Sequence, residues 1–81
     1  MSTSPASLEP LATDVTVSDE RLSVVLSDGR EVSAPLAWFP RLLSATPEQR
    51  KDWRLIGGGV GIGWRSVDEH VSVAGLLTTA R

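Results

Sequence analysis

Cysteine is absent from the 81 residues, and His70 is the only histidine. Disulfides and thiolate metal sites are therefore excluded, and the absence of cysteine fits a reducing compartment. A structural metal site needs about four ligands. A single histidine beside Asp68 and Glu69 is thus better explained as part of a solvated turn, and we expect no bound metal and no cofactor.

Long apolar runs and a strong charge of one sign are also missing. No stretch approaches the roughly 18 apolar residues of a membrane-spanning helix, and the N-terminus lacks the basic and apolar blocks of a signal peptide. The net charge of −2 gives no electrostatic reason for nucleic-acid binding. The small basic cluster of Arg50, Lys51 and Arg54 is interpreted as a solvated face. We expect a cytoplasmic protein that binds neither a membrane nor nucleic acid directly.

No catalytic constellation is recognisable. No serine stands at a diagnostic spacing from His70. The glycine-rich stretch 57–64 reads GGGVGIGW. It lacks the Gly-Lys-Ser/Thr of a phosphate-binding loop, and its spacing differs from G-x-G-x-x-G. We therefore expect a protein without enzymatic activity.

The residues that are present fit one small α+β domain. With 41% hydrophobic and 22% charged residues, the composition is that of a globular protein. A chain of this length buries roughly 60% of the surface that it exposes when unfolded. Residues 1–13 are rich in Ser, Thr and Pro and carry no periodicity, so we predict a disordered tail there and the domain over residues 14–81.

Alternating apolar residues predict antiparallel strands after residue 14. A tight turn at Asp19 and Glu20 places Val17 opposite Leu22, so that the apolar side chains of both strands share one face. The register also decides the length of the next loop, at residues 27–29.

A two-residue loop at that point would mix the two faces of the sheet. A three-residue loop with a left-handed Gly29 instead pairs Leu26 with Arg30 and keeps the apolar residues together. This register leaves the guanidinium of Arg30 free at the rim of the sheet, while its aliphatic stem lies over Leu26.

Short helices are expected after the third strand. Helical spacing within residues 36–45 predicts one that begins near Phe39 or Pro40, since proline is tolerated only in a first turn. The sequence TPEQ at 46–49 is a capping box and predicts a second helix that runs to about Trp53. A serine cap predicts the last helix, over about residues 73–80.

The glycine-rich stretch 57–64 predicts a strand with one bare face. Alternation places Ile62 and Trp64 on an apolar face, and Gly59 and Gly61 on the other. Because interior strand glycines reduce stability, either a helix of the same domain or a partner protein should approach the bare face closely. The expected fold is an antiparallel meander sheet packed against two or three short helices in two layers.

Tryptophan supplies the remaining candidates for a binding surface. There are three, and tryptophan serves both as core filler and as interface anchor. Trp64 is predicted to lie in the core, whereas Trp38 and Trp53 flank short helices, so that one of them is a candidate for an interaction patch. The predicted partner-binding residues are Arg30, Trp38, Gly59, Gly61 and Asp68.

Five short segments carry a family resemblance through their order and spacing: LSDGR (26–30), FPRL (39–42), ATPEQR (45–50), GIGW (61–64) and DEHVSV (68–73). Together they resemble a small bacterial domain family of unknown function catalogued as 2442, over about residues 15–77. The resemblance implies a compact α+β fold. It also implies relatives that occur alone, beside a small partner gene as in toxin-antitoxin pairs, or fused to a helix-turn-helix domain. The family has no assigned catalytic residues.

Two hypotheses on function follow. The first is a small non-enzymatic protein-interaction module, antitoxin-like or an adaptor, whose partner is a neighbouring small protein. The alternative is a regulatory or ligand-sensing domain that acts within a transcriptional complex. The identity of the partner and the oligomeric state stay open at this stage.

Overall fold

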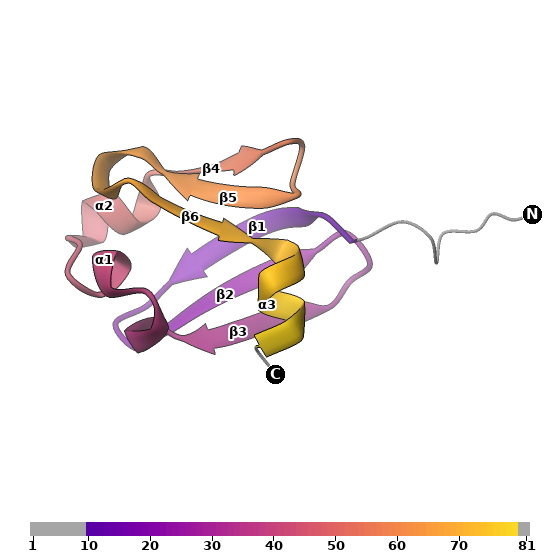
Figure 1. Cartoon of the computed structure of the whole chain (residues 1–81), viewed down its shortest axis with the longest axis horizontal. Helices are drawn as coiled ribbons and strands as arrows, with labels where there is room; N and C mark the ends of the chain where they lie inside the picture. Colours follow the sequence, from indigo (N-terminus) through magenta and orange to yellow (C-terminus); the bar gives the residue numbers. More distant parts are fainter. Residues whose placement is uncertain (1–9, 80–81) are drawn as a thin grey trace, which may run out of the picture.

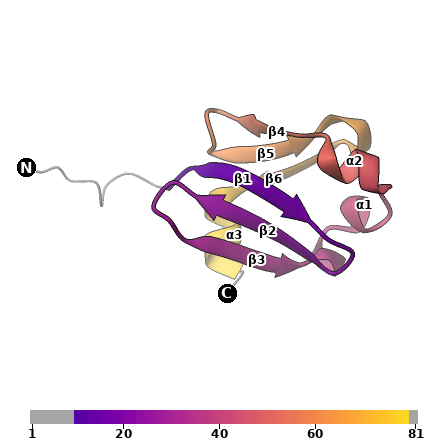
Figure 2. The ribbon, with the colours of Figure 1, turned by 180° about the vertical axis from the view of Figure 1, so that it is seen from behind.

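The computed structural model describes residues 10–79 and contains two three-stranded antiparallel sheets (Figure 1). The first sheet consists of β1 (Ala12–Val17), β2 (Arg21–Leu26) and β3 (Glu31–Pro35), and the second of β4 (Trp53–Ile56), β5 (Gly61–Trp64) and β6 (Glu69–Ser72). The helices are α1 (Pro40–Leu43), α2 (Pro47–Lys51) and α3 (Val73–Thr79), with 3-10 turns η2 (Leu36–Trp38) and η3 (Arg65–Val67). Seen from behind, the first sheet lies in front of β6 and α3 (Figure 2). The predicted α+β class with antiparallel strands and short helices is confirmed, with two sheets where one meander was expected.

The strands of the first sheet have the predicted register. Val17 pairs with Leu22 and Val15 with Val24 between β1 and β2, and Val24 pairs with Val32 between β2 and β3. Their apolar side chains therefore share the inner face, as the alternation of the sequence requires.

The loop between β2 and β3 contains the predicted left-handed glycine. Gly29 has φ +94°, and the N–H of Leu26 donates to the carbonyl of Arg30 at 2.8 Å. The Arg30 guanidinium is not free as predicted, because its Nε lies 2.8 Å from Asp28 Oδ2. The Arg30 backbone N–H also donates to Asp28 Oδ1 at 3.0 Å. This backbone bond is the main reason why the pKa of Asp28 lies below its ordinary value.

We expect Gly29→Val to destabilise the domain by about 1–2 kcal/mol or more, because a β-branched residue is strained at positive φ. A Cβ at position 29 would meet no atom within 4 Å, so the loss would report on backbone conformation alone. Urea unfolding measures it. Gly29→Asn is the control and should lose less, since asparagine tolerates left-handed backbone; an unchanged midpoint for the valine variant would contradict the loop geometry.

The domain begins earlier than predicted. Ala12 opens β1, is 1% exposed, and donates its N–H to the carbonyl of Gly59 at 2.8 Å. The boundary at residue 14 was therefore two residues late, because this stretch carries too few apolar side chains to show alternation. Residues 1–9 of the predicted tail lie outside the described part of the chain.

The three helices agree with their sequence signals. Pro40 begins α1, and Thr46 and Gln49 form the complete capping box of α2. The second helix ends at Lys51, so that Trp53 belongs to β4 and not to the helix. The last helix, α3, runs over Val73–Thr79, and the predicted end at residue 80 lies outside the described residues.

The glycine-rich stretch is a hairpin and not one continuous strand. Gly57, Gly58 and Gly59 have φ of +61°, +72° and +120° and form the turn between β4 and β5. The predicted strand over 57–64 was thus wrong in its first half, because successive glycines adopt positive φ without steric penalty and can reverse the chain. The strand β6 was not predicted either; a polar turn followed by a helix was expected in its place.

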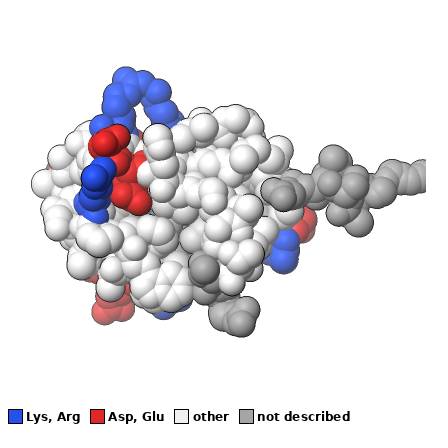
Figure 3. Space-filling view, viewed as in Figure 1, with Lys and Arg blue, Asp and Glu red and all other residues white. Residues whose placement is uncertain are grey.

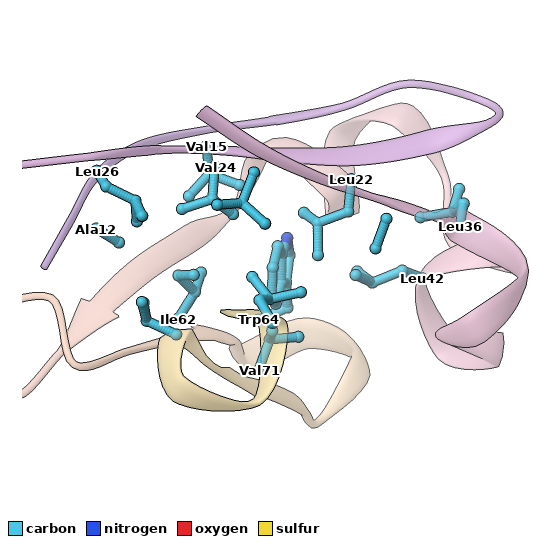
Figure 4. Close-up of a cluster of buried hydrophobic side chains, with 14 residues drawn as sticks. Ala12, Val15, Leu22, Val24, Leu26, Leu36, Leu42, Ile62, Trp64 and Val71 are labelled. Atoms are coloured by element: carbon cyan, nitrogen blue, oxygen red, sulfur yellow. The ribbon is translucent and has the colours of Figure 1, made fainter. Parts of the chain in front are cut away.

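A buried cluster between the two sheets forms the core (Figure 4). Trp64 lies in it with no exposed surface, as predicted, and its indole N–H donates to the carbonyl of Arg50 at 3.0 Å. The largest fully buried side chains of this core are Trp64, Leu22, Leu36, Leu42, Ile62 and Val24.

Arg50 is buried, which corrects its interpretation as part of a solvated face. Only 9% of the residue is exposed. Its Nε donates to the carbonyl of Leu42 and its Nη2 to that of Leu43, both at 3.0 Å, and its Nη1 lies 2.8 Å from Asp19 Oδ1. The guanidinium thus satisfies carbonyls at the C-terminus of α1, which would otherwise have no partner within the helix.

Candidate functional site

The two glycines among the predicted partner-binding residues lie inside the fold. A Cβ on Gly59 would stand 2.6 Å from the carbonyl oxygen of Ala12, and one on Gly61 would stand 3.2 Å from that of Val71. The glycines were predicted to allow another part of the structure to approach their backbone closely, and such an approach exists. The approaching groups are backbone atoms of β1 and β6, however, and not a helix or a partner protein. Both residues are buried and belong to no open surface.

Arg30 and Trp38 lie near opposite ends of β3, roughly 17 Å apart for a strand of this length. The structure therefore does not bring these two predicted residues together. Asp68 has φ +54°, and its carbonyl accepts a hydrogen bond from Arg41 Nη1 at 2.6 Å. This contact ties α1 to the turn before β6, so Asp68 has a structural role in addition to its exposed carboxylate.

Trp38 borders a groove of about 810 Å³. Its walls come from three elements: Trp38 and Phe39 at the end of η2, residues 70–72 of β6, and Gly75 and Leu76 of α3. Trp38 is 51% exposed, whereas Phe39 packs partly against the core. The groove thus presents a large aromatic side chain that the fold does not bury.

The groove lies on a face with little charge. The central part of this face, over β6 and α3, shows no charged side chain, and the charged residues lie toward its margins (Figure 3). The polar side chains in the groove are those of His70 and Ser72. Because Ser72 Oγ accepts the Gly75 N–H at 2.9 Å and caps α3, His70 is the more available of the two.

Trp38 was predicted as a binding residue, but the other residues of the groove were not. His70 was assigned to a solvated turn, yet it lies in β6 and lines the groove. A signal was present, since Val71 and Val73 alternate with polar residues and both are buried. No pattern in the sequence joins residue 38 to residues 70–76, because only the tertiary fold brings them together.

Two further observations bear on chemistry. Within residues 10–79, no group of three or more His, Cys, Asp or Glu side chains gathers that could hold a metal ion. None of the helices in that range is long and apolar enough to cross a membrane. The absence of a cofactor, a metal and enzymatic activity stays a prediction.

Comparisons with known proteins agree with the fold. A family model described as "Protein of unknown function (DUF2442)" matches residues 12–81. A crystal structure of a protein of unknown function from Rhodospirillum rubrum is similar, with a TM-score of 0.72 and 28% sequence identity. The alignment covers 86% of this chain and 87% of that chain. Curated proteins give no match. The matched range of the family model includes every element that lines the groove.

Proposed function

The chain belongs to the DUF2442 family of proteins of unknown function, and we propose that it is a non-enzymatic protein-interaction module that binds a partner through the groove between η2, β6 and α3. The observation that carries this proposal is the half-exposed Trp38 beside an open groove on a face with little charge. Tryptophan is enriched among the residues that dominate binding energy at protein interfaces. In the cell, the module is an antitoxin-like or adaptor partner of a small cytoplasmic protein.

The position of Trp38 at a concave surface is stronger support for binding than its exposure to solvent. Leu43, which is 47% exposed, and Val60, which is 55% exposed, do not line the groove. Single exposed apolar residues are ordinary. Trp38, in contrast, stands at a concave surface together with Phe39 and Leu76, where an apolar side chain of a partner would be surrounded on several sides.

A regulatory, ligand-sensing role is the second candidate. The groove volume of about 810 Å³ lies within the usual range of small-molecule sites, and His70 supplies a polar group at its wall. Native mass spectrometry of protein purified from its host separates the candidates. A stoichiometric small molecule that is lost in Trp38→Ala would favour ligand sensing, whereas a bound protein that is lost in this variant would favour the interaction module.

We expect Trp38→Ala to weaken partner binding by about thirtyfold, because truncation of an interface tryptophan typically removes about 2 kcal/mol. The test is affinity capture from the native host with quantitative mass spectrometry, followed by titration of the purified partner. Leu43→Ala is the matched control, since it removes a similarly exposed apolar side chain outside the groove. If the wild type, Trp38→Ala and Leu43→Ala all capture the same partner equally, the proposed site is wrong.

A further inference from the structure

The groove exposes the free edge of a β-strand. Within the described sheet, β6 pairs with β5 and has no strand on its other side. All three residues from 70 to 72 line the groove, so this second edge opens into it. Figure 1 shows β6 leading directly into α3, which places the free edge between η2 and that helix.

The pairing pattern shows which backbone groups point into the groove. The N–H of Val73 donates to the carbonyl of Val60 at 3.0 Å, one pair beyond the end of the β5–β6 ladder. Hydrogen-bonded and non-hydrogen-bonded pairs alternate in antiparallel sheets. Val71 therefore bonds to β5, whereas the backbone groups of His70 and the N–H of Ser72 point away from it. In the described part of the chain, no residue bonds to these groups.

We infer that an extended, uncharged segment of the partner protein adds to β6 as a fourth strand of the second sheet. This inference rests on the proposed function and names the form of the partner. One residue of the segment accepts the His70 N–H and donates its own N–H to the His70 carbonyl, as in other strand additions. The neighbouring side chains of the segment pack on Trp38 and Leu76.

The chemistry of the groove favours this occupant. A charged segment would lose hydration against groove walls that contain no Lys, Arg, Asp or Glu, and an uncharged one avoids that penalty. A second copy of this chain fits less well, because it would bring its own η2 and α3 against the same two walls. A single extended segment has no such flanking elements and reaches the edge between them.

Proline at position 70 tests the hydrogen bond directly. His70→Pro removes one of the two N–H groups that point into the groove, that of His70, and leaves the bonds between β5 and β6 in place; proline is tolerated at such edge positions. His70→Ala removes the imidazole but keeps the N–H. Peptides selected on the wild-type protein from a random phage-displayed library serve as probes. We expect His70→Pro to bind them about tenfold more weakly, with His70→Ala close to wild type.

A second measurement does not depend on a folded proline variant. In complexes of the wild-type protein with a selected peptide, the amide hydrogens of His70 and Ser72 should become protected from exchange. Unprotected amides, or selected peptides rich in charged residues, would overturn the inference. If Trp38→Ala abolishes binding while both amides stay unprotected, the groove binds proteins without strand addition. If Trp38→Ala has no effect either, the proposed function fails as well.

Discussion

Replacing Trp64 by alanine should remove a large part of the stability of the domain, with a loss of about 3–5 kcal/mol. The side chain is fully buried and lies at the centre of the core between the two sheets (Figure 4). A chain of 81 residues has a total stability of roughly 4–12 kcal/mol. The variant should therefore be unfolded in a large fraction of molecules, or unfold at a much lower urea concentration.

Two matched variants separate the contributions to this loss. Trp38→Ala makes the same chemical change at a half-exposed position and should change the free energy of unfolding by less than about 1 kcal/mol. Trp64→Phe keeps most of the apolar volume but loses the indole N–H that donates to the carbonyl of Arg50. Its expected loss lies between those of the two alanine variants. Circular dichroism during urea unfolding measures all three, and equal midpoints for Trp64→Ala and Trp38→Ala would contradict the assigned core.

The bond between Trp64 and Arg50 also explains how the helices are fixed to the second sheet. The Arg50 carbonyl accepts the indole N–H from β5, and its guanidinium donates to carbonyls of Leu42 and Leu43 at the end of α1. One residue of α2 therefore connects two other elements. In the chain, α1 follows η2 after Phe39 alone, so the end of η2 that carries Trp38 lies next to the helix fixed in this way.

The first sheet was predictable from sequence and the second only in part, for a physical reason. In β2 and β3 the apolar residues alternate regularly, and Gly29 allows one loop length that keeps them on one face. In β5, Ile62 and Trp64 alternate with Gly61 and Gly63, and this alternation indicated the face that lies in the core. Three further glycines before them are compatible with a strand or a turn. The strand β6 holds only four residues, and the polar residues just before Val71 favoured a turn over the alternation of Val71 and Val73.

The candidate site was predictable only in part. Trp38 was named because an aromatic residue beside a short helix is a frequent interface anchor. The free edge of β6 exists because β6 pairs only with β5, whose other neighbour is β4. The β4–β5 hairpin was not predicted, because its turn consists of glycines that are also compatible with a strand. The burial of Arg50 was not predicted for a related reason. Its guanidinium binds backbone carbonyls, and every residue has one, so the sequence does not show which carbonyls it binds.

The contact between Gly59 and Ala12 is the point at which the two sheets are joined by backbone. The Ala12 N–H at the start of β1 donates to the carbonyl of Gly59, in the turn between β4 and β5, at 2.8 Å. Gly59 has φ +120°, a conformation that residues with a Cβ rarely adopt. A Cβ at this position would stand 2.6 Å from the Ala12 carbonyl oxygen and 2.9 Å from the Cβ of Leu11.

Gly59→Ala is therefore expected to destabilise the domain by about 2–5 kcal/mol, the sum of backbone strain of about 1–2 kcal/mol and overpacking of about 1–3 kcal/mol. The neighbouring Gly58 provides the matched control. Its φ is +72°, but a Cβ there would meet no atom within 4 Å, so Gly58→Ala should lose only about 1–2 kcal/mol. The difference between the two variants in urea unfolding isolates the contact with β1. If both lose the same amount, the backbone of Ala12 can move away without penalty, and the junction does not hold the sheets together.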